Sequence, residues 1–308
     1  MPAHCVLCWP LVSRKPTMEL NSTIVTTPVR SAATVVMLRD APQGLEVFLI
    51  RRHGLSDVLG GAYVFPGGKV DALDAAADTQ AHLDQSAHTL HACLGEPDID
   101  ATTAASFYIA ALRESFEESG VLFAQGASAA QVSLARTLLA DGLPFAAVLA
   151  RLGLRLHTQS VTPWVRWITP LMPSVSSKRF DTRFFVSAMP PDQTASHDNH
   201  EATESVWLAP RAALTQYRDA KIELAPPQIM SLAHLSRHAS VASVLSEARS
   251  RLPPVVQPEP FDQDGMRVLC YPGDARHSVS ARALPGPSRL QYRNQRFEPV
   301  DGFESLFA

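Results

Sequence analysis

Short hydrophobic runs separated by turn-forming residues mark the first part of the chain. Residues 32–39 and 45–52 are apolar and rich in branched side chains, and the segment 40–44 between them contains Asp, Pro and Gly. Two such runs around a turn predict a pair of neighbouring strands. Further apolar runs of strand length predict strands at 63–65, 165–169, 183–188, 205–208 and 266–271.

Longer segments between these runs have apolar residues at helical spacing. The segment 104–119 is the longest, and Gly120 directly after it predicts where the helix ends, because glycine readily adopts the left-handed conformation of a helix C-terminus. Strands and helices that alternate in this way predict an α/β fold, in which a mixed sheet lies between two helical layers. We expect further helices at 132–140, 144–152, 210–217, 226–238 and 241–251.

The pattern divides the chain into three parts. Residues 1–28 are predicted to be a poorly structured N-terminal extension, and the sequence does not decide whether Met1 or Met18 is the true start. Residues 29–252 are expected to form one domain, since no clean linker separates two independent patterns. Residues 253–308 contain eight prolines and predict a loop-rich C-terminal extension with one short strand.

Composition and charge exclude several classes of protein. A net charge of −3 over 308 residues provides no basic surface for nucleic acid. No apolar run is long enough to span a membrane, and the first residues lack the basic start of a secretory signal. Four cysteines in this length do not form a disulfide framework, and the pair Cys5 and Cys8 lacks a second pair for a zinc site. We therefore expect a cytoplasmic protein without nucleic-acid or membrane partners; a homodimer is compatible with the sequence, which does not determine the oligomeric state.

Three carboxylates gather near the C-terminal end of the predicted helix 104–119. Glu114, Glu117 and Glu118 stand at positions i, i+3 and i+4, which share one face of a helix. A hard divalent cation would relieve their repulsion, because it prefers clustered carboxylate oxygens, and Arg113 can neutralise part of the cluster from four residues before Glu117. A solvated acidic face is the alternative, but the apolar first half of the segment indicates a helix packed inside the domain.

The sequence around these acids resembles a known signature. Residues 113–121 read Arg-Glu-Ser-Phe-Glu-Glu-Ser-Gly-Val, and Phe-Pro-Gly-Gly stands upstream at 65–68. This order is similar to the second half of the Nudix box, the signature of Nudix hydrolases. The resemblance implies a Nudix-type α/β/α sandwich with a mixed sheet. It also implies hydrolysis of a nucleoside diphosphate linked to another group, with Mg²⁺ or Mn²⁺ as the cofactor and a small-molecule nucleotide as the substrate.

The first half of the box departs from the family pattern. Asp74, a shorter acid, stands in the place of a Glu, and 38 residues separate it from Arg113 instead of the usual short spacer. Residues from about 75 to 104 therefore form an insertion, which is expected to be helical. The chain absorbs it at little entropic cost, because closure entropy grows only logarithmically with loop length. The insertion leaves and rejoins the chain beside the acidic helix, where it can form a lid or one wall of a pocket.

An interruption at this place resembles the coenzyme A diphosphatase-like branch of the family. Segments 61–68, 179–185 and 204–210 agree with that branch. The resemblance implies coenzyme A or an acyl-coenzyme A as the substrate, although residues 49–53 match the coenzyme A signature only in part. ADP-ribose, NADH or a nucleotide sugar is the alternative substrate. A non-catalytic ligand sensor with the same fold is a third hypothesis, which Asp74 and the interrupted box keep open.

The resemblance also assigns roles to the residues of the box. It implies that Glu117 and Glu118 are the main metal ligands. Glu114 either completes the metal site or accepts the proton of the attacking water. Arg113 is expected to orient these acids by ion pairing rather than to bind phosphate.

Residues outside the helix are candidates for binding the substrate. Gly67 and Gly68 are expected to shape the turn and to offer backbone groups to metal or phosphate. Arg51 and Arg52 end a predicted strand and point to opposite faces, so at most one of them, taken here as Arg52, binds a phosphate. Arg183 is a similar candidate for a 3′-phosphate, against the commoner role of an arginine on the surface.

The general base is open from the sequence alone. Glu201, Glu204 and His200 are candidates outside the box. They lie in a polar segment, where such residues are more often solvated than catalytic. Three tryptophans in apolar segments are expected to pack in the core rather than to stack on a base: Trp164, Trp167 and Trp207.

Overall fold

The structure is a computed structural model that describes residues 20–21, 23–54, 60–173, 178–198 and 202–308. Met18, the pair Cys5 and Cys8, and two candidates for the general base, His200 and Glu201, lie outside the described residues. Within the described part, the strands form one large sheet and one smaller sheet near the C-terminus.

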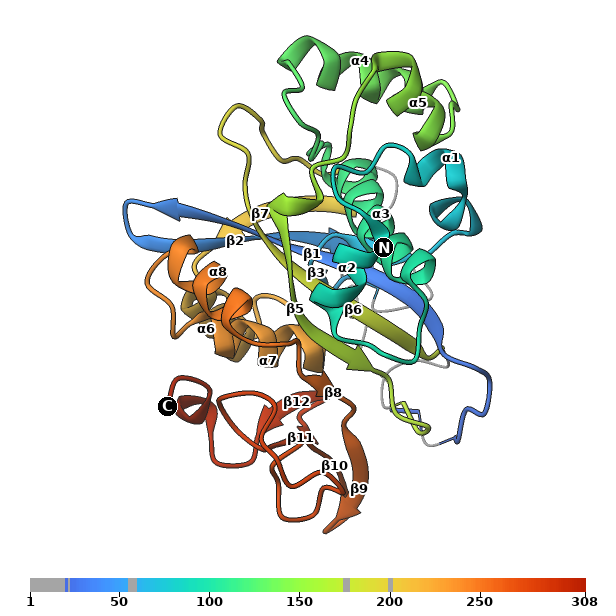
Figure 1. Ribbon diagram of the computed structural model, residues 1–308. Helices are drawn as coiled ribbons and strands as arrows, with labels where there is room; N and C mark the ends of the chain where they lie inside the picture. Colours follow the sequence, from blue (N-terminus) through green and yellow to red (C-terminus); the bar gives the residue numbers. More distant parts are fainter. Residues whose placement is uncertain (1–19, 22, 55–59, 174–177, 199–201) are drawn as a thin grey trace, which may run out of the picture.

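An eight-stranded sheet forms the centre of the molecule (Figure 1). Its strands follow the order β3-β2-β1-β6-β5-β8, with β4 paired to β1 and β7 paired to β2. The β1–β6 and β5–β8 pairs are parallel and the other pairs are antiparallel, which confirms the predicted mixed sheet. The strands are β1 Arg30–Ala41, β2 Gly44–Arg52, β3 Tyr63–Val64, β4 Gly67–Lys69, β5 Val161–Ile168, β6 Phe180–Ala188, β7 Ala202–Leu208 and β8 Val255–Val256.

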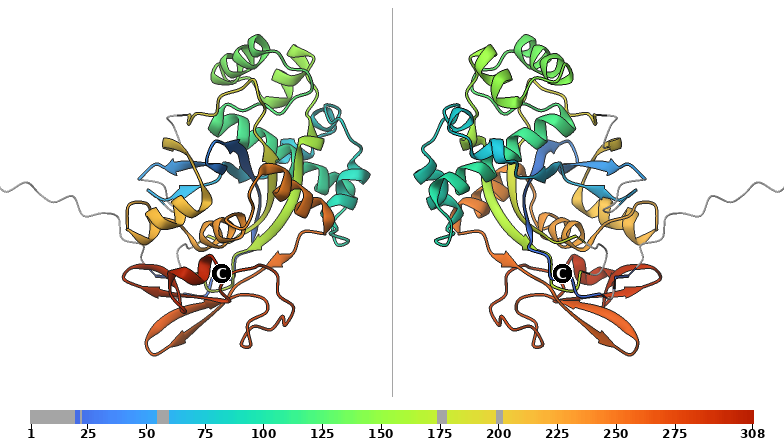
Figure 2. Two further views of the ribbon diagram at one scale, coloured as in Figure 1. Left: turned by 90° about the vertical axis from the view of Figure 1, so that its left-hand side faces the viewer. Right: turned by 90° about the vertical axis from the view of Figure 1, so that its right-hand side faces the viewer.

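Helices cover both faces of this sheet (Figures 1 and 2). The helix that carries the acidic cluster, α3, covers one face, and α4 and α5 pack into the same core. Three helices that follow β7 cover the other face. The helices of the two layers are α3 Ala101–Ser119, α4 Ala129–Ala140 and α5 Phe145–Leu152, and α6 Pro210–Arg218, α7 Pro226–Leu235 and α8 Val241–Ser250.

Strand alternation explains why β1 is a continuous apolar run. Successive side chains of a strand point to opposite faces. Val35 and Met37 belong to the core under α3, whereas Val36 and Leu38 belong to the core under α6, α7 and α8. Because both faces are covered, all four positions are apolar and fully buried.

The insertion between Asp74 and the acidic helix is helical, as the sequence predicts. Asp74 itself lies in η1 Ala72–Ala75, and the insertion after it contains α1 Ala77–Gln80 and α2 Ala87–Leu94. Ser86 caps the start of α2 by accepting a hydrogen bond from the Thr89 N–H. Gly95 ends that helix with a φ of 65°, and the turn after it leads directly into α3. The insertion packs against α3, the helix that directly follows it in the sequence.

The C-terminal extension contains more strands than predicted. The expectation of a single strand at 266–271 was wrong, because four strands form an antiparallel sheet in the order β12-β11-β10-β9. Pro260 and Pro299 lie in β9 and β12, which are its two edge strands, where the N–H that proline lacks is not needed for pairing. The strands are β9 Glu259–Gln263, β10 Met266–Cys270, β11 Arg289–Arg293 and β12 Arg296–Pro299, followed by η3 Phe303–Leu306.

This small sheet shares a core with the main sheet. Leu269, Leu290 and Phe297 are buried in the same cluster as the helices of the second layer. The Tyr217 hydroxyl of α6 donates a hydrogen bond to the Phe297 carbonyl over 2.8 Å. The extension is thus held against α6 and α7, below them in Figure 1. Across the described residues, no helix combines the length and the apolarity needed to cross a bilayer.

Candidate active site

The acidic cluster lies at the C-terminal end of α3. Asp100 caps the start of this helix by accepting a hydrogen bond from the Thr103 N–H, and Gly120 ends it with a φ of 68°. Most residues between these caps are buried, so the helix is fixed along its length. Its last two turns carry the three glutamates, of which Glu114 and Glu118 lie against β4.

Glu118 is tied to the first glycine of β4. Its side chain is buried, with 4% exposed, and its Oε2 accepts a hydrogen bond from the Gly67 N–H over 2.7 Å. A Cβ at Gly67 would lie 2.4 Å from the Ala33 carbonyl oxygen of β1, so only glycine fits at this point. The backbone of β4 is therefore held between β1 and the helix carboxylate.

Gly68 leaves room for the carboxylate of Glu114. A Cβ at Gly68 would lie 2.5 Å from Cδ, Oε1 and Oε2 of Glu114. The glycine pair thus has a steric role that the sequence did not specify. The absence of a side chain lets the β1 backbone approach Gly67 and lets the Glu114 carboxylate approach Gly68.

Replacing Gly68 by Ala should displace the Glu114 carboxylate without breaking the backbone. The contact at 2.5 Å is with the end of a flexible side chain, so the carboxylate rotates away and β4 stays in place. We expect kcat to fall by about 10- to 100-fold, as is typical when a reacting group is misplaced by about 1 Å. The midpoint of thermal unfolding should change little. Gly54→Ala is a matched control, since no described atom lies within 4 Å of a Cβ there. Full activity of Gly68→Ala would contradict a role for Glu114 in this position.

Arg113 binds the acids on the other side of the cluster. Its Nη1 lies 2.8 Å from Glu114 Oε1 and 2.9 Å from Glu117 Oε2. Its Nε and Nη2 each lie 2.9 Å from an oxygen of Asp74, which gives a bidentate pair. Burial of Arg113 opposes its charge, but the hydrogen bonds that it donates to Asp74 and the negative charges of Glu114, Asp74 and Glu117 raise its pKa above the usual value. Arg113 is thus an ion-pair partner of the acids, as the resemblance implies.

Asp74 contacts the acidic end of α3 although the insertion separates the two in the sequence. This carboxylate is 1% exposed and lies in η1, where it also accepts a hydrogen bond from the Asp71 N–H over 2.7 Å. Asp74, which contacts Arg113, directly precedes the insertion in the sequence. A shorter acid in this place therefore holds Arg113 although 38 residues separate the two in the sequence.

A cavity of about 560 Å³ opens beside Gly68 and Glu114. Arg52, Gly67, Gly68 and Glu114 line one end of it, so the structure brings these four predicted residues together. A volume of this size is typical of a small-molecule site. Glu117 and Glu118 are positioned next to this end through their contacts with Arg113 and Gly67.

The two arginines at the end of β2 point in different directions, as predicted. Arg52 lines the cavity, whereas Arg51 lies 3.6 Å from Glu204 and donates a hydrogen bond to the Gly61 carbonyl. Glu204 also interacts with Tyr63, and burial together with this hydrogen bond raises the pKa of the Tyr63 hydroxyl to about 12. Glu204 therefore takes part in the pairing of β2, β3 and β7 and does not line the cavity.

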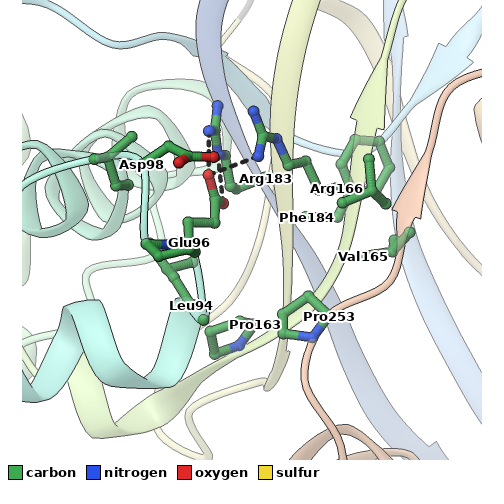
Figure 3. Close-up of a pocket in the computed structure, with 13 residues that line it drawn as sticks. Leu94, Glu96, Asp98, Pro163, Val165, Arg166, Arg183, Phe184 and Pro253 are labelled. Atoms are coloured by element: carbon green, nitrogen blue, oxygen red, sulfur yellow. Dashed lines mark hydrogen bonds and ion pairs between the residues drawn. The ribbon is translucent and has the colours of Figure 1, made fainter.

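Arg183 is not brought to this cavity. Its side chain is 4% exposed and lies 2.5 Å from Glu96 Oε2 and 3.0 Å from Asp181 Oδ2. Figure 3 shows Glu96 pointing from the turn after α2 toward Arg183 and Arg166, in a second cavity of about 250 Å³. The guanidinium of Arg183 also lies 3.8 Å above the ring of Phe107 on α3. The residue thus joins the insertion to the central sheet, a contact that only long-range folding reveals.

Replacing Glu96 by Gln should weaken this attachment of the insertion. The amide keeps the size of the side chain but removes the charge that faces two arginines, of which Arg183 is buried. Asp181 still neutralises part of their charge, so we expect the free energy of unfolding to fall by about 2 kcal/mol. Denaturant titration measures this free energy of unfolding. Glu46→Gln, in the exposed pair with Arg39, is the control and should cost less than about 1 kcal/mol. Equal losses in the two variants would contradict a structural role for the buried contact.

The residues at the end of α3 fit a hard divalent cation. Asp74, Glu114 and Glu117 carry three negative charges around Arg113, which offsets only one of them, and Glu118 adds a fourth. The space that a Cβ at Gly68 would fill lies directly against the Glu114 carboxylate. Carboxylate oxygens are the ligands that Mg²⁺ and Mn²⁺ prefer.

A second cluster of metal-binding residue types joins α7 to α8. Among the described residues, His234, His238 and Glu247 are the set whose ligand atoms already lie within 4.8 Å of one another. Arg251 lies 2.8 Å from Glu247 Oε1 and competes with a cation for that carboxylate. Burial opposes ionisation of Glu247, but the hydrogen bond that Arg251 donates and the interactions with His234 outweigh it and lower the pKa of Glu247 to about 2. This cluster is therefore explained as a hydrogen-bonded network between two helices.

Known proteins match this chain over most of its length. The model of the NUDT19 Nudix domain matches residues 22–235. The acyl-coenzyme A diphosphatase NUDT19 of Xenopus laevis is 26% identical over 231 residues, which are 64% of this chain and 61% of that protein. The match thus spans less than two thirds of this relative. The protein of the same name from Gallus gallus is 26% identical over 69% of each chain. A crystal structure of a NUDIX hydrolase from Alicyclobacillus acidocaldarius superposes with a TM-score of 0.58 and 26% identity, covering 74% of this chain and 98% of that one.

Proposed function

This chain belongs to the NUDT19 Nudix domain family, and from that premise we propose that it hydrolyses the diphosphate of coenzyme A or of an acyl-coenzyme A in a metal-dependent reaction. Relatives in Xenopus laevis and Gallus gallus carry the name acyl-coenzyme A diphosphatase. The proposed cofactor is Mg²⁺ or Mn²⁺.

One observation carries the proposal. Glu114 lines a cavity of about 560 Å³, next to a glycine that leaves space for its carboxylate. Glu118 and Glu117 stand beside it on the same helix, held by Gly67 and Arg113. A concave site with several carboxylates at one end suits a metal-bound diphosphate better than it suits a neutral ligand.

The residues of the chain have separate tasks in this reaction. Glu117 and Glu118 are the main metal ligands, and Glu114 either completes the set or accepts the proton of the attacking water. A bound divalent cation offsets the charge of the diphosphate and lowers the pKa of the attacking water. Arg113 holds Glu114 and Glu117 in place through its ion pairs. Arg52, at the same end of the cavity, binds a phosphate oxygen.

A substrate panel with Mg²⁺ and with Mn²⁺ tests the proposal. The expected result is release of adenosine 3′,5′-bisphosphate from coenzyme A or an acyl-coenzyme A, with loss of turnover on chelation of the metal. If neither compound is hydrolysed but ADP-ribose, NADH or a nucleotide sugar is, the proposed substrate is wrong and the proposed type of reaction stands. Tight binding of a nucleotide without turnover of any of these compounds would instead identify a ligand sensor.

Two further predictions from the sequence belong to this proposal. A homodimer is one, and light scattering after size-exclusion chromatography tests it. Location in the cytoplasm is the other, and fractionation of cells that express the chain tests it. Neither prediction changes the assignment of the residues above.

A further inference from the structure

The cavity extends well beyond the carboxylates. Strand register sets four of its lining residues in one row across the sheet: Lys69 pairs with Ala32, Ala32 with Thr182 and Thr182 with Trp167. Adjacent strands lie about 4.8 Å apart, so the row from β4 to β5 spans about 14 Å. This is the length of about four residues of extended chain. The floor of the cavity is thus long enough for an extended arm on one side of a diphosphate.

Part of the lining far from Glu114 is an apolar wall. Trp167 and Phe180 come from the sheet, and Pro227 comes from the start of α7. Pro258 and Leu269 come from the C-terminal extension, which therefore forms one wall of the cavity. An apolar wall of this kind suits a hydrocarbon chain, and the cationic residues Arg30 and Lys178 line the same cavity beside Phe180.

Two residues of this part of the lining carry buried polar atoms without a partner. Trp167 is 4% exposed and its Nε1 has no hydrogen-bond partner within the described part of the chain; the same is true of Oε1 of Gln228, which is 7% exposed. Both residues line the cavity. Buried polar groups are almost always hydrogen-bonded, so an unpaired donor and an unpaired acceptor on two residues that line one cavity point to a ligand that supplies both partners.

We infer that this far end binds the amide-bearing, pantetheine-type arm of the substrate. A secondary amide carries one carbonyl and one N–H, which match the Trp167 N–H donor and the Gln228 carbonyl acceptor. Because both atoms have almost no exposed surface, a side-chain rotation accompanies the contact. The inference rests on the proposed function, which places the diphosphate at Glu114. It makes Gln228 and Trp167 specificity-determining residues, and it places the nucleotide on the other side of the carboxylates.

Fragments of the substrate test this inference by calorimetry on the full chain with Mg²⁺. Gln228→Met keeps the length of the side chain and removes the acceptor. We expect 4′-phosphopantetheine to bind about tenfold more weakly, the usual effect of one lost hydrogen bond. The affinity for adenosine 3′,5′-bisphosphate should stay within about twofold of that of the unaltered chain, since that fragment lies on the other side. Gln216→Met on α6, outside the cavity lining, is the matched control and should change neither affinity.

A second variant guards against a folding defect. Trp167→Phe keeps an aromatic ring and removes the N–H. It should weaken the binding of 4′-phosphopantetheine and leave the binding of adenosine 3′,5′-bisphosphate unchanged. Unchanged 4′-phosphopantetheine binding in both variants would overturn the inference, as would weaker binding of the adenosine bisphosphate instead. Absence of any binding of 4′-phosphopantetheine to the unaltered chain would overturn it too. Selective loss in a chain that does not hydrolyse coenzyme A would support the arm site and remove the proposed function.

Discussion

Glu117→Gln and Glu118→Gln should each lower kcat by about three orders of magnitude and leave the chain folded. Each change removes a negative charge from the end of α3 and keeps the size of the side chain. In the Glu118→Gln variant, the amide oxygen can still accept the hydrogen bond from the Gly67 N–H, which Glu118 accepts over 2.7 Å. A bound metal ion supplies several kcal/mol of transition-state stabilisation. If the variant loses about 4 kcal/mol of it, kcat falls by about a thousandfold.

Turnover of coenzyme A at saturating Mg²⁺ measures this effect, and circular dichroism with thermal unfolding checks the fold. Glu204→Gln is the matched control, because the Glu204 side chain is 51% exposed and its carboxylate pairs with Arg51 away from the cavity. It should keep turnover within about twofold. Near-normal turnover in both helix variants would contradict the assignment of these carboxylates as metal ligands.

Arg113→Met should lower the free energy of unfolding by about 3–5 kcal/mol and reduce activity as well. The substitution leaves Asp74, whose side chain is 2% exposed, as a buried carboxylate without its cationic partner. It also releases Glu114 and Glu117 from the guanidinium that now lies 2.8 and 2.9 Å from them. Repulsion between the carboxylates then adds to the cost of the buried charge.

Chemical denaturation of Arg113→Met and of a double variant, Arg113→Met with Asp74→Leu, separates these costs. The double variant removes the buried charge and should regain part of the lost stability. Arg113→Lys should behave more like Arg113→Met than like the unaltered chain, because an ammonium group cannot pair with both oxygens of Asp74 and with two glutamates at once. A loss below about 1 kcal/mol in Arg113→Met would show that the ion pairs do not support the fold.

Features set by near neighbours in the sequence were predictable. The helix that carries the acids, its end at Gly120 and the alternation of Arg51 and Arg52 depend on periodicity within a few residues. The i,i+4 ion pair between Arg113 and Glu117 has the same origin. The family signature added a chemical meaning to these positions, and the comparisons with known proteins show that the chain belongs to this family.

Features that depend on distant parts of the chain were not predictable from the sequence. Arg183 was a candidate for binding phosphate, but Glu96 of the insertion and Asp181 hold it in a separate cavity. No local pattern links residues that are 87 positions apart. Strands of the C-terminal extension were missed for a related reason, because Pro260 reads as a strand breaker until its edge position is known.

The sequence by itself determined the acidic face of α3 and the glycines that end and face it, since a helix or a turn depends on residues adjacent in the chain. Only the tertiary structure decided which of the candidates share a cavity: Arg52 and Glu114 do, and Arg183 does not. It also brought Trp167, Gln228 and Leu269 to the far end of that cavity from three separate elements. Strand register and helix packing make these choices, and both follow from burial of the two sheet faces rather than from any short segment.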